Sequence, residues 1–159
     1  CCCRRAIYGL VLSLNINNSL TKERVCTMKK ILIPLDGTER SKKSIELVQD
    51  LYMPESIEVI LLVVREDLDM IRSKMEYEDA KKEIMPILDE AEELLKSYNI
   101  SKHVSFGRAG EEILETAKLG NADIIVMTKS TRKGWVSMIG SVAMHVVKYA
   151  TCIVMIVPE

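Results

Sequence analysis

The chain has 159 residues, of which 48% are apolar and 28% charged, and its formal net charge is −1. These values are typical of a globular protein with one domain, and they exclude collagen-like, mucin-like and wholly disordered chains. Because acidic and basic residues are balanced, no general excess of positive charge favours nucleic-acid binding. No apolar run reaches the roughly 18 to 20 residues of a membrane helix, so we expect neither a nucleic-acid partner nor a membrane span.

The first 27 residues differ from the rest of the chain in charge. They carry a net charge of +3, which leaves −4 on residues 28–159. Met28 stands directly before the first strand-like run and has the features of a start signal. We therefore expect residues 1–27 to be an upstream extension outside the fold and residues 28–159 to form the domain. A secretory signal is the alternative, because Arg4 and Arg5 precede an apolar stretch, although no small-residue cleavage site follows that stretch.

The five cysteines indicate a reducing environment. Three of them are contiguous at positions 1–3, and contiguous thiols make neither a disulfide framework nor a tetrahedral metal site. Cys152 falls in an apolar, strand-like run, where a buried free thiol is the ordinary case. We therefore expect a cytoplasmic protein.

From Met28 onward, short apolar runs alternate with longer amphipathic ones, which is the pattern of a parallel sheet with crossover helices. Strands are predicted over residues 31–35, 57–64, 103–106, 123–127 and 152–157. Helices are predicted over residues 39–52, 73–98, 111–119 and 140–150. We expect a kink or a restart at Pro86 and a helix C′ position at Gly120. The sequence therefore predicts one α/β domain with a doubly wound parallel sheet.

Ligands of such sheets bind at the carboxyl ends of the strands. The loop that follows the fourth predicted strand carries the most chemistry, since Lys129, Arg132 and Lys133 precede Gly140 and Ser141 at a helix start. Free N–H groups, the helix dipole and the glycine together favour a phosphate cradle at this place. A solvated basic loop followed by an ordinary helix cap is the alternative.

Asp36 follows the first predicted strand and has two interpretations. It either lines the ligand site or caps the turn that Gly37 and Thr38 make with it. A catalytic acid would need a histidine or a second carboxylate beside it, and the sequence assigns no such partner to His103 or His145. We therefore predict no catalytic residue.

Three segments of the sequence resemble the universal stress protein family. Residues 31–38, ILIPLDGT, read like the first strand of that family with its Pro-x-Asp-x-Ser/Thr ending. Residues 107–127 are similar to its third-helix region, and residues 140–143 with 152–157 are similar to its closing helix and strand. The resemblance covers nearly all of residues 28–159. It implies five strands in the order 3-2-1-4-5, helices on both faces of the sheet, and dimers in many members.

The resemblance also implies an ATP site, with or without Mg²⁺. It places Pro34, Leu35, Asp36 and Val64 around the nucleoside and Gly140, Ser141 and Val142 around the phosphates. Thr128 and Thr131 stand where the family's ATP-binding loop has two glycines, and eight residues rather than nine separate Thr131 from Gly140. A Cβ at each threonine restricts positive φ and close approach of a phosphate. The sequence leaves open whether this site holds a nucleotide.

Three classes of function are weighed against these observations. The first is a cytoplasmic stress-response regulator that binds an adenine nucleotide, ATP, and is not an enzyme beyond weak ATP hydrolysis. The second is a nucleotide-free dimeric interaction module of the same family. A nucleotide-hydrolysing or adenylating enzyme is a third class, but it would need a Ser/Gly-rich loop after the first strand, where this chain has Asp36-Gly37-Thr38.

The last predicted strand, residues 152–157, is apolar at nearly every position. In the strand order that the resemblance implies, this strand lies at an edge of the sheet. A bare apolar edge favours pairing with another strand. We therefore predict a homodimer joined through Cys152 to Val157.

Overall fold

The computed structural model describes residues 28–66, 73–129 and 139–158. One parallel sheet is formed by β1 (Lys29–Leu35), β2 (Ile57–Arg65), β3 (Asn99–Phe106), β4 (Ile124–Thr128) and β5 (Ile153–Val157). The helices are α1 (Glu39–Leu51), α2 (Lys74–Leu94), α3 (Ala109–Leu119) and α4 (Ser141–Tyr149), and a 3-10 turn, η1, spans Pro54–Ser56. The strand order is β3-β2-β1-β4-β5, which confirms the predicted fold class.

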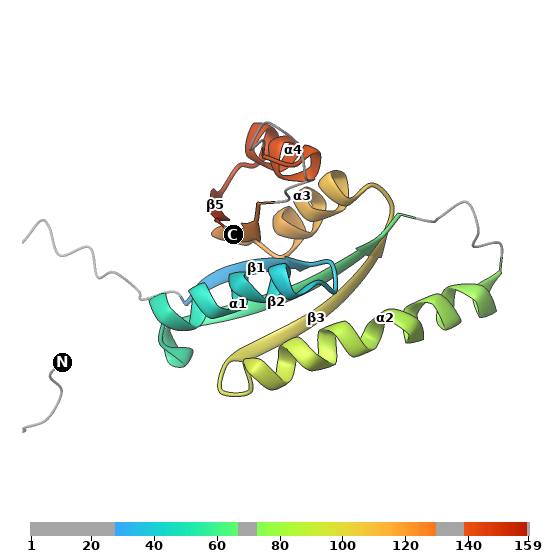
Figure 1. Cartoon of the computed structure of the whole chain (residues 1–159), viewed down its shortest axis with the longest axis horizontal. Helices are drawn as coiled ribbons and strands as arrows, with labels where there is room; N and C mark the ends of the chain where they lie inside the picture. Colours follow the sequence, from blue (N-terminus) through green and yellow to red (C-terminus); the bar gives the residue numbers. More distant parts are fainter. Residues whose placement is uncertain (1–27, 67–72, 130–138, 159) are drawn as a thin grey trace, which may run out of the picture.

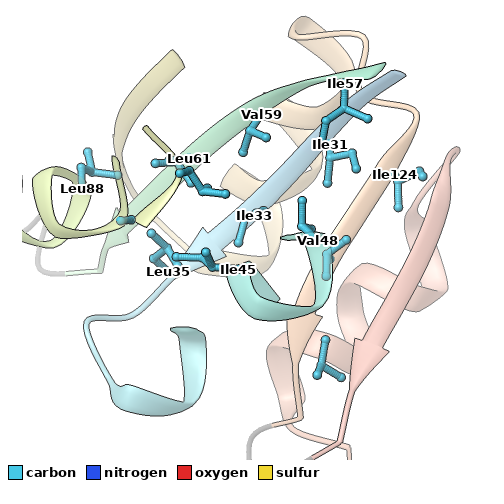
Figure 2. Close-up of a cluster of buried hydrophobic side chains, with 14 of the residues drawn as sticks. Ile31, Ile33, Leu35, Ile45, Val48, Ile57, Val59, Leu61, Leu88 and Ile124 are labelled. Atoms are coloured by element: carbon cyan, nitrogen blue, oxygen red, sulfur yellow. The ribbon is translucent and has the colours of Figure 1, made fainter. Parts of the chain in front are cut away.

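Helices cover both faces of the sheet, α1 and α2 on one and α3 and α4 on the other (Figure 1). The central strand β1 supplies side chains to both cores. Ile31 and Ile33 join the core under α1 and α2, which Figure 2 shows, whereas Leu32 joins the core under α3 and α4. These three side chains have no exposed area. Burial on both faces explains why β1 is apolar from Ile31 onward, since each such side chain contributes about 1.5–3 kcal/mol.

The strand β3 begins four residues before the start predicted from the sequence, at Asn99 rather than at His103. It pairs with β2 and lies at the edge of the sheet. Asn99, Ser101 and His103 are all exposed, and the residues between them are half-buried. Because one face of this edge strand is open to water, its first half has polar residues and lacks the apolar run that marks a buried strand.

The helix α2 runs through Pro86 without interruption, so of the predicted kink or restart the restart is wrong and the kink stays a prediction. Ser73 begins the helix in a capping box, in which Ser73 Oγ accepts from the Glu76 N–H and Glu76 accepts from the Ser73 N–H. Pro86 and Lys82 are both exposed. The carbonyl of Lys82, which loses its helical donor to the proline, therefore has access to water.

The end of α3 differs by one residue from the prediction. Asn121, not Gly120, has the left-handed conformation, with φ of 52° against −76° at Gly120. The N–H of Ala122 donates to the Ala117 carbonyl at 2.8 Å, and the N–H of Asn121 donates to the Lys118 carbonyl at 3.2 Å. These two bonds make a Schellman motif with Asn121 at C′.

A glycine is needed at position 120 because a side chain there would collide with its neighbours. A Cβ at this position would lie 2.7 Å from Ile60 Cδ1 and 3.1 Å from the Thr116 carbonyl oxygen. The glycine thus lets the end of α3 approach β2. None of the helices in the described part of the chain is both long and apolar enough to cross a membrane.

Candidate functional site

A cavity of about 190 Å³ lies at the carboxyl ends of β1 and β4. Its lining comes from the ends of three strands and from the first turns of α1, α3 and α4. The lining residues are Pro34, Leu35, Asp36, Arg40, Ser41, Val64, Ala109, Ile113, Met127, Thr128, Val142 and Ala143. This is the edge of the sheet where parallel α/β folds bind their ligands.

Six of the nine site residues predicted from the sequence line this cavity, namely Pro34, Leu35, Asp36, Val64, Thr128 and Val142. Ser141 lines an adjoining hollow, and Gly140 is the N-cap residue of α4. Thr131 lies outside the described residues. The structure therefore gathers the predicted residues of three strand ends and of α4 in one place, and their role in binding a ligand stays a prediction.

Sequence reasoning missed the other half of the lining. Arg40 and Ser41 belong to the first turn of α1, and Ile113 comes from α3. The sequence held a weak indication of these residues, because the helix that follows a strand in such a sheet begins at the same edge where the strand ends. Met127 precedes Thr128 at the end of β4, within the strand predicted over residues 123–127.

Asp36 both holds a turn and lines the cavity. Asp36 Oδ1 accepts from the Thr38 N–H at 3.0 Å and from the Thr38 hydroxyl at 2.6 Å. Gly37 between them has φ of +75°, and a Cβ there would lie 2.8 Å from Ile87 Cδ1. The turn interpretation of Asp36 and the site interpretation are thus compatible.

The Asp36 carboxyl is ionised at neutral pH. Partial burial is the largest single effect and pushes its pKa upward, but the hydrogen bonds from Thr38 and Ser41 and the charge of Arg40 together outweigh it, and the pKa lies below the usual value. The cavity therefore has a fixed carboxylate in its wall, which can accept hydrogen bonds from a ligand.

The first turn of α4 offers backbone donors beside the cavity. The first intrahelical bond runs from the Met144 N–H to the Gly140 carbonyl at 2.9 Å, so no bond within the helix uses the N–H groups of residues 141–143. The N-cap residue, Gly140, has no side chain that could cap this end of the helix. These N–H groups and the positive end of the helix dipole favour an anion here.

The first turn of α3 is already occupied. The Ala109 N–H donates to Glu66 Oε1 at 3.0 Å, so a carboxylate from the end of β2 caps this helix. Between the starts of α3 and α4 lies a hollow of about 280 Å³, which shares Ala109 and Val142 with the cavity. The two helix starts approach each other closely, because a Cβ on Gly110 would lie 2.8 Å from His145 Cδ2.

Neither histidine lines the cavity. His145 packs against Gly110, and its ring centroid lies 4.8 Å from that of Tyr149. His103 is exposed on the edge strand β3. Among the residues of the described ranges, no group of three acidic, histidine or cysteine side chains is placed to hold a metal ion.

A second cavity, of about 390 Å³, lies at the opposite end of the sheet, between the last turns of α3 and α4. Leu119, Tyr149 and Cys152 are part of its lining. Burial raises the pKa of the Cys152 thiol, which keeps it protonated and unreactive at neutral pH. This cavity faces the amino ends of β4 and β5, where parallel sheets do not bind ligands, so the cavity beside Asp36 is the candidate site.

The model of the universal stress protein family matches residues 27–158 of the chain. The chain belongs to the universal stress protein family. This family assignment confirms the resemblance seen in the sequence. No curated protein matches the chain.

Several solved structures share the fold of this chain. The hypothetical protein MJ0577 is 27% identical, with a TM-score of 0.64 over 83% of this chain and 96% of that chain. A universal stress protein in complex with cAMP is 20% identical, with a TM-score of 0.64 over 82% of this chain and 97% of that chain. A universal stress protein from Archaeoglobus fulgidus in complex with dAMP is 16% identical, with a TM-score of 0.59 over 83% of this chain and 98% of that chain.

Proposed function

We propose that this universal stress protein binds an adenine nucleotide, ATP included, in the cavity beside Asp36 and acts as a nucleotide-linked stress-response regulator in the cytoplasm. The observation that carries the proposal is the meeting of an ionised carboxylate, apolar walls and the backbone donors in the first turn of α4 around one cavity. The adenine nucleotides cAMP and dAMP in two structures of the same fold support this ligand class.

Each part of a nucleotide has a matching group in the lining. Val64, Ile113 and Met127 offer apolar contact to the faces of a base. Asp36 offers a carboxylate to the ribose hydroxyls, and the N–H groups of the first turn of α4 offer donors to a phosphate. Mg²⁺ would enter with the phosphates, since it binds through phosphate oxygens and few protein ligands.

The composition of the cavity wall favours binding over catalysis. Asp36 and Arg40 are the ionisable side chains in the described lining, and both histidines lie elsewhere. A hydrolase needs a group that takes a proton from water, and a carboxylate whose pKa is lowered is a weak base. We therefore propose a regulator and, at most, slow ATP hydrolysis.

We also propose that the protein is a homodimer joined through the edge strand β5, over Cys152 to Val157. β5 lies at the sheet edge and carries Ile153, which is 62% exposed. α4 packs beside β5 and exposes Met144 and Val147 as well. The other edge strand, β3, exposes polar side chains instead, so β5 is the edge that favours pairing.

The domain that we assign to this function is residues 28–159, and the family match over residues 27–158 supports these bounds. Every experiment proposed below uses the whole chain, so that its result does not depend on whether residues 1–27 are needed for function.

Nucleotide binding is tested by thermal unfolding of the full chain with AMP, ADP and ATP, each with and without Mg²⁺. A ligand at about 100 times its dissociation constant adds about 2.7 kcal/mol to stability, which raises Tm by roughly 3 to 6 °C. We expect this rise for the wild type and its loss in Gly140→Val, since the branched side chain covers the donors at the start of α4.

The neighbouring substitution Ile139→Val is the matched control. It changes an exposed side chain just before the N-cap and should keep the rise in Tm. No rise with any of the three nucleotides at millimolar concentration would contradict nucleotide binding and favour the interaction module.

A further inference from the structure

We infer that α2 positions the Asp36 carboxylate of the proposed nucleotide site, because Ile87 of this helix packs against the turn at residues 36–38. This inference rests on the proposed function and concerns the same site. Ile87 is not among the described residues that line the nucleotide cavity. It acts on the ligand through the turn and is therefore a positioning residue.

The turn at residues 36–38 is in close contact with α2. A Cβ on Gly37 would lie 2.8 Å from Ile87 Cδ1 and 3.3 Å from Ile87 Cγ1, so the Ile87 side chain packs directly on the Gly37 backbone. The space left between the turn, α1 and α2 is about 10 Å³, which is at the lower limit for a single water molecule. Because this contact is close-packed, a shift of α2 at Ile87 either displaces the turn or opens a void.

The same turn fixes the direction of the Asp36 carboxylate. Asp36 Oδ1 accepts from the Thr38 N–H at 3.0 Å and from the Thr38 hydroxyl at 2.6 Å. The Thr38 carbonyl accepts from the Ser41 N–H at 3.0 Å and from the Ser41 hydroxyl at 2.7 Å, which ties the turn to α1. The position of the carboxylate in the cavity wall thus depends on the backbone of residues 37 and 38, which Ile87 supports.

A second contact joins α2 to α1 beside the turn, where the two helices cover the same face of the sheet (Figure 1). Lys42 Nζ donates to Glu90 Oε1 of α2 at 2.6 Å and to Glu39 Oε1 of α1 at 2.7 Å. Glu90 follows Ile87 by three residues, so the two side chains lie on one face of α2. The ion pair therefore keeps the Ile87 face of the helix against α1 and the turn.

Coupling between α2 and the site works in both directions. Since the docked position of α2 holds Asp36 in the geometry that binds a nucleotide, a bound nucleotide stabilises that position of α2 by the same free energy. Most of the first half of α2 is exposed. Nucleotide binding therefore changes the stability of a helix at the molecular surface.

The experiment is isothermal titration of the full chain with AMP and with ATP, in the wild type, Ile87→Ala and Ile87→Leu. We expect Ile87→Ala to weaken the affinity for the nucleotide that binds by about five-fold or more, because the turn loses its support. Leucine has the same number of carbon atoms as isoleucine, so Ile87→Leu should bind within about two-fold of the wild type.

Ile84→Ala is the matched control. Ile84 lies one turn earlier on α2, is half-buried like Ile87 and packs against the same core, but it does not contribute to the described lining of the space beside Gly37. Its substitution removes the same atoms and should change nucleotide affinity by less than about two-fold. The pair Ile87→Val and Ile84→Val repeats the comparison with one carbon removed, which the fold tolerates better, and Ile87→Val should bind more weakly than Ile84→Val.

Hydrogen exchange measures the reverse direction of the coupling. In the wild type a saturating nucleotide should slow exchange of the amides of residues 87–91. In Ile87→Ala, at the same saturation, this slowing should be smaller. A side chain that only adds stability to the helix would leave the effect of the nucleotide on these amides unchanged.

The outcomes separate this inference from the proposed function. If the wild type binds neither AMP nor ATP, the proposed function is wrong and this inference is overturned with it. If the wild type binds a nucleotide and the Ile87 variants bind it as tightly as the matched Ile84 variants, nucleotide binding stands and the role of Ile87 is overturned. Exchange in α2 that does not respond to a bound nucleotide also overturns the coupling.

Discussion

Two buried serines on α1 differ in one hydrogen bond. The Ser41 hydroxyl donates to the Thr38 carbonyl at 2.7 Å, whereas Ser44 Oγ has no hydrogen-bond partner among the residues that the structure describes. A buried polar group without a partner costs about 1–3 kcal/mol. Alanine also has a higher helix propensity than serine.

Ser44→Ala should therefore raise the free energy of unfolding by about 1 kcal/mol, measured by urea denaturation. Ser41→Ala, on the same helix face, should lower it by about 1 kcal/mol, because that substitution removes a bond that is made. A loss of stability in Ser44→Ala would mean that its hydroxyl is bonded in solution.

At the residue scale, the sequence predicted those site residues that lie near the carboxyl end of a strand or directly after it. Asp36, Val64 and Thr128 are of this kind, because chain order alone places strand ends at one edge of a parallel sheet. Ser41 and Ile113 could not be assigned in this way. Whether a helical side chain faces the cavity or the core depends on how the helix packs, which the sequence pattern does not specify.

At the scale of the element, the stability of the end of α3 depends on the backbone conformation of Asn121. Asn121 has φ of 52°, a region that costs most residues about 1 kcal/mol or more. Asn121→Ala should lower Tm, with a loss of about 1 kcal/mol, whereas Asn121→Gly should change stability by less than about 0.5 kcal/mol. Thermal unfolding checks both, and equal losses in the two variants would show that the Asn121 side chain, not the backbone, matters.

Whole elements could be predicted from the sequence where burial is uniform. β1 and β2 have helices on both faces, so their apolar runs identified them closely. The sequence predicted only the second half of β3, because an edge strand with one face open to water can carry polar residues such as Asn99 and Ser101. Pro86 suggested that α2 restarts there, but the helix is continuous. Its face at Pro86 is exposed, so water can take the place of the lost hydrogen bond.

At the scale of the whole molecule, the proposed dimer depends on the bare edge of β5. Ile153→Lys places a charge on that edge at a side chain that is already 62% exposed, so the fold should tolerate it. We expect the wild type to sediment as a dimer at micromolar concentration and Ile153→Lys as a monomer, because an edge lysine opposes strand pairing.

Met75→Lys is the control for the dimer. Met75 is 74% exposed in the first turn of α2, a helix that packs against β2 and β3 at the other edge of the sheet, and its substitution should leave the dimer intact. A wild type that sediments as a monomer would contradict the proposed interface, and an Ile153→Lys dimer would assign the interface to another surface.

The position of β1 in the middle of the sheet has a consequence for the newly made chain. One neighbour of β1 is β2, which follows it closely, but the other is β4, which begins only at Ile124. A ribosome that adds about 5 to 20 residues per second needs roughly 5 to 20 s to pass from β1 to β4. During synthesis the central strand of the sheet therefore waits with one edge unpaired, and this interval is when the chain is most exposed to aggregation and most in need of a chaperone.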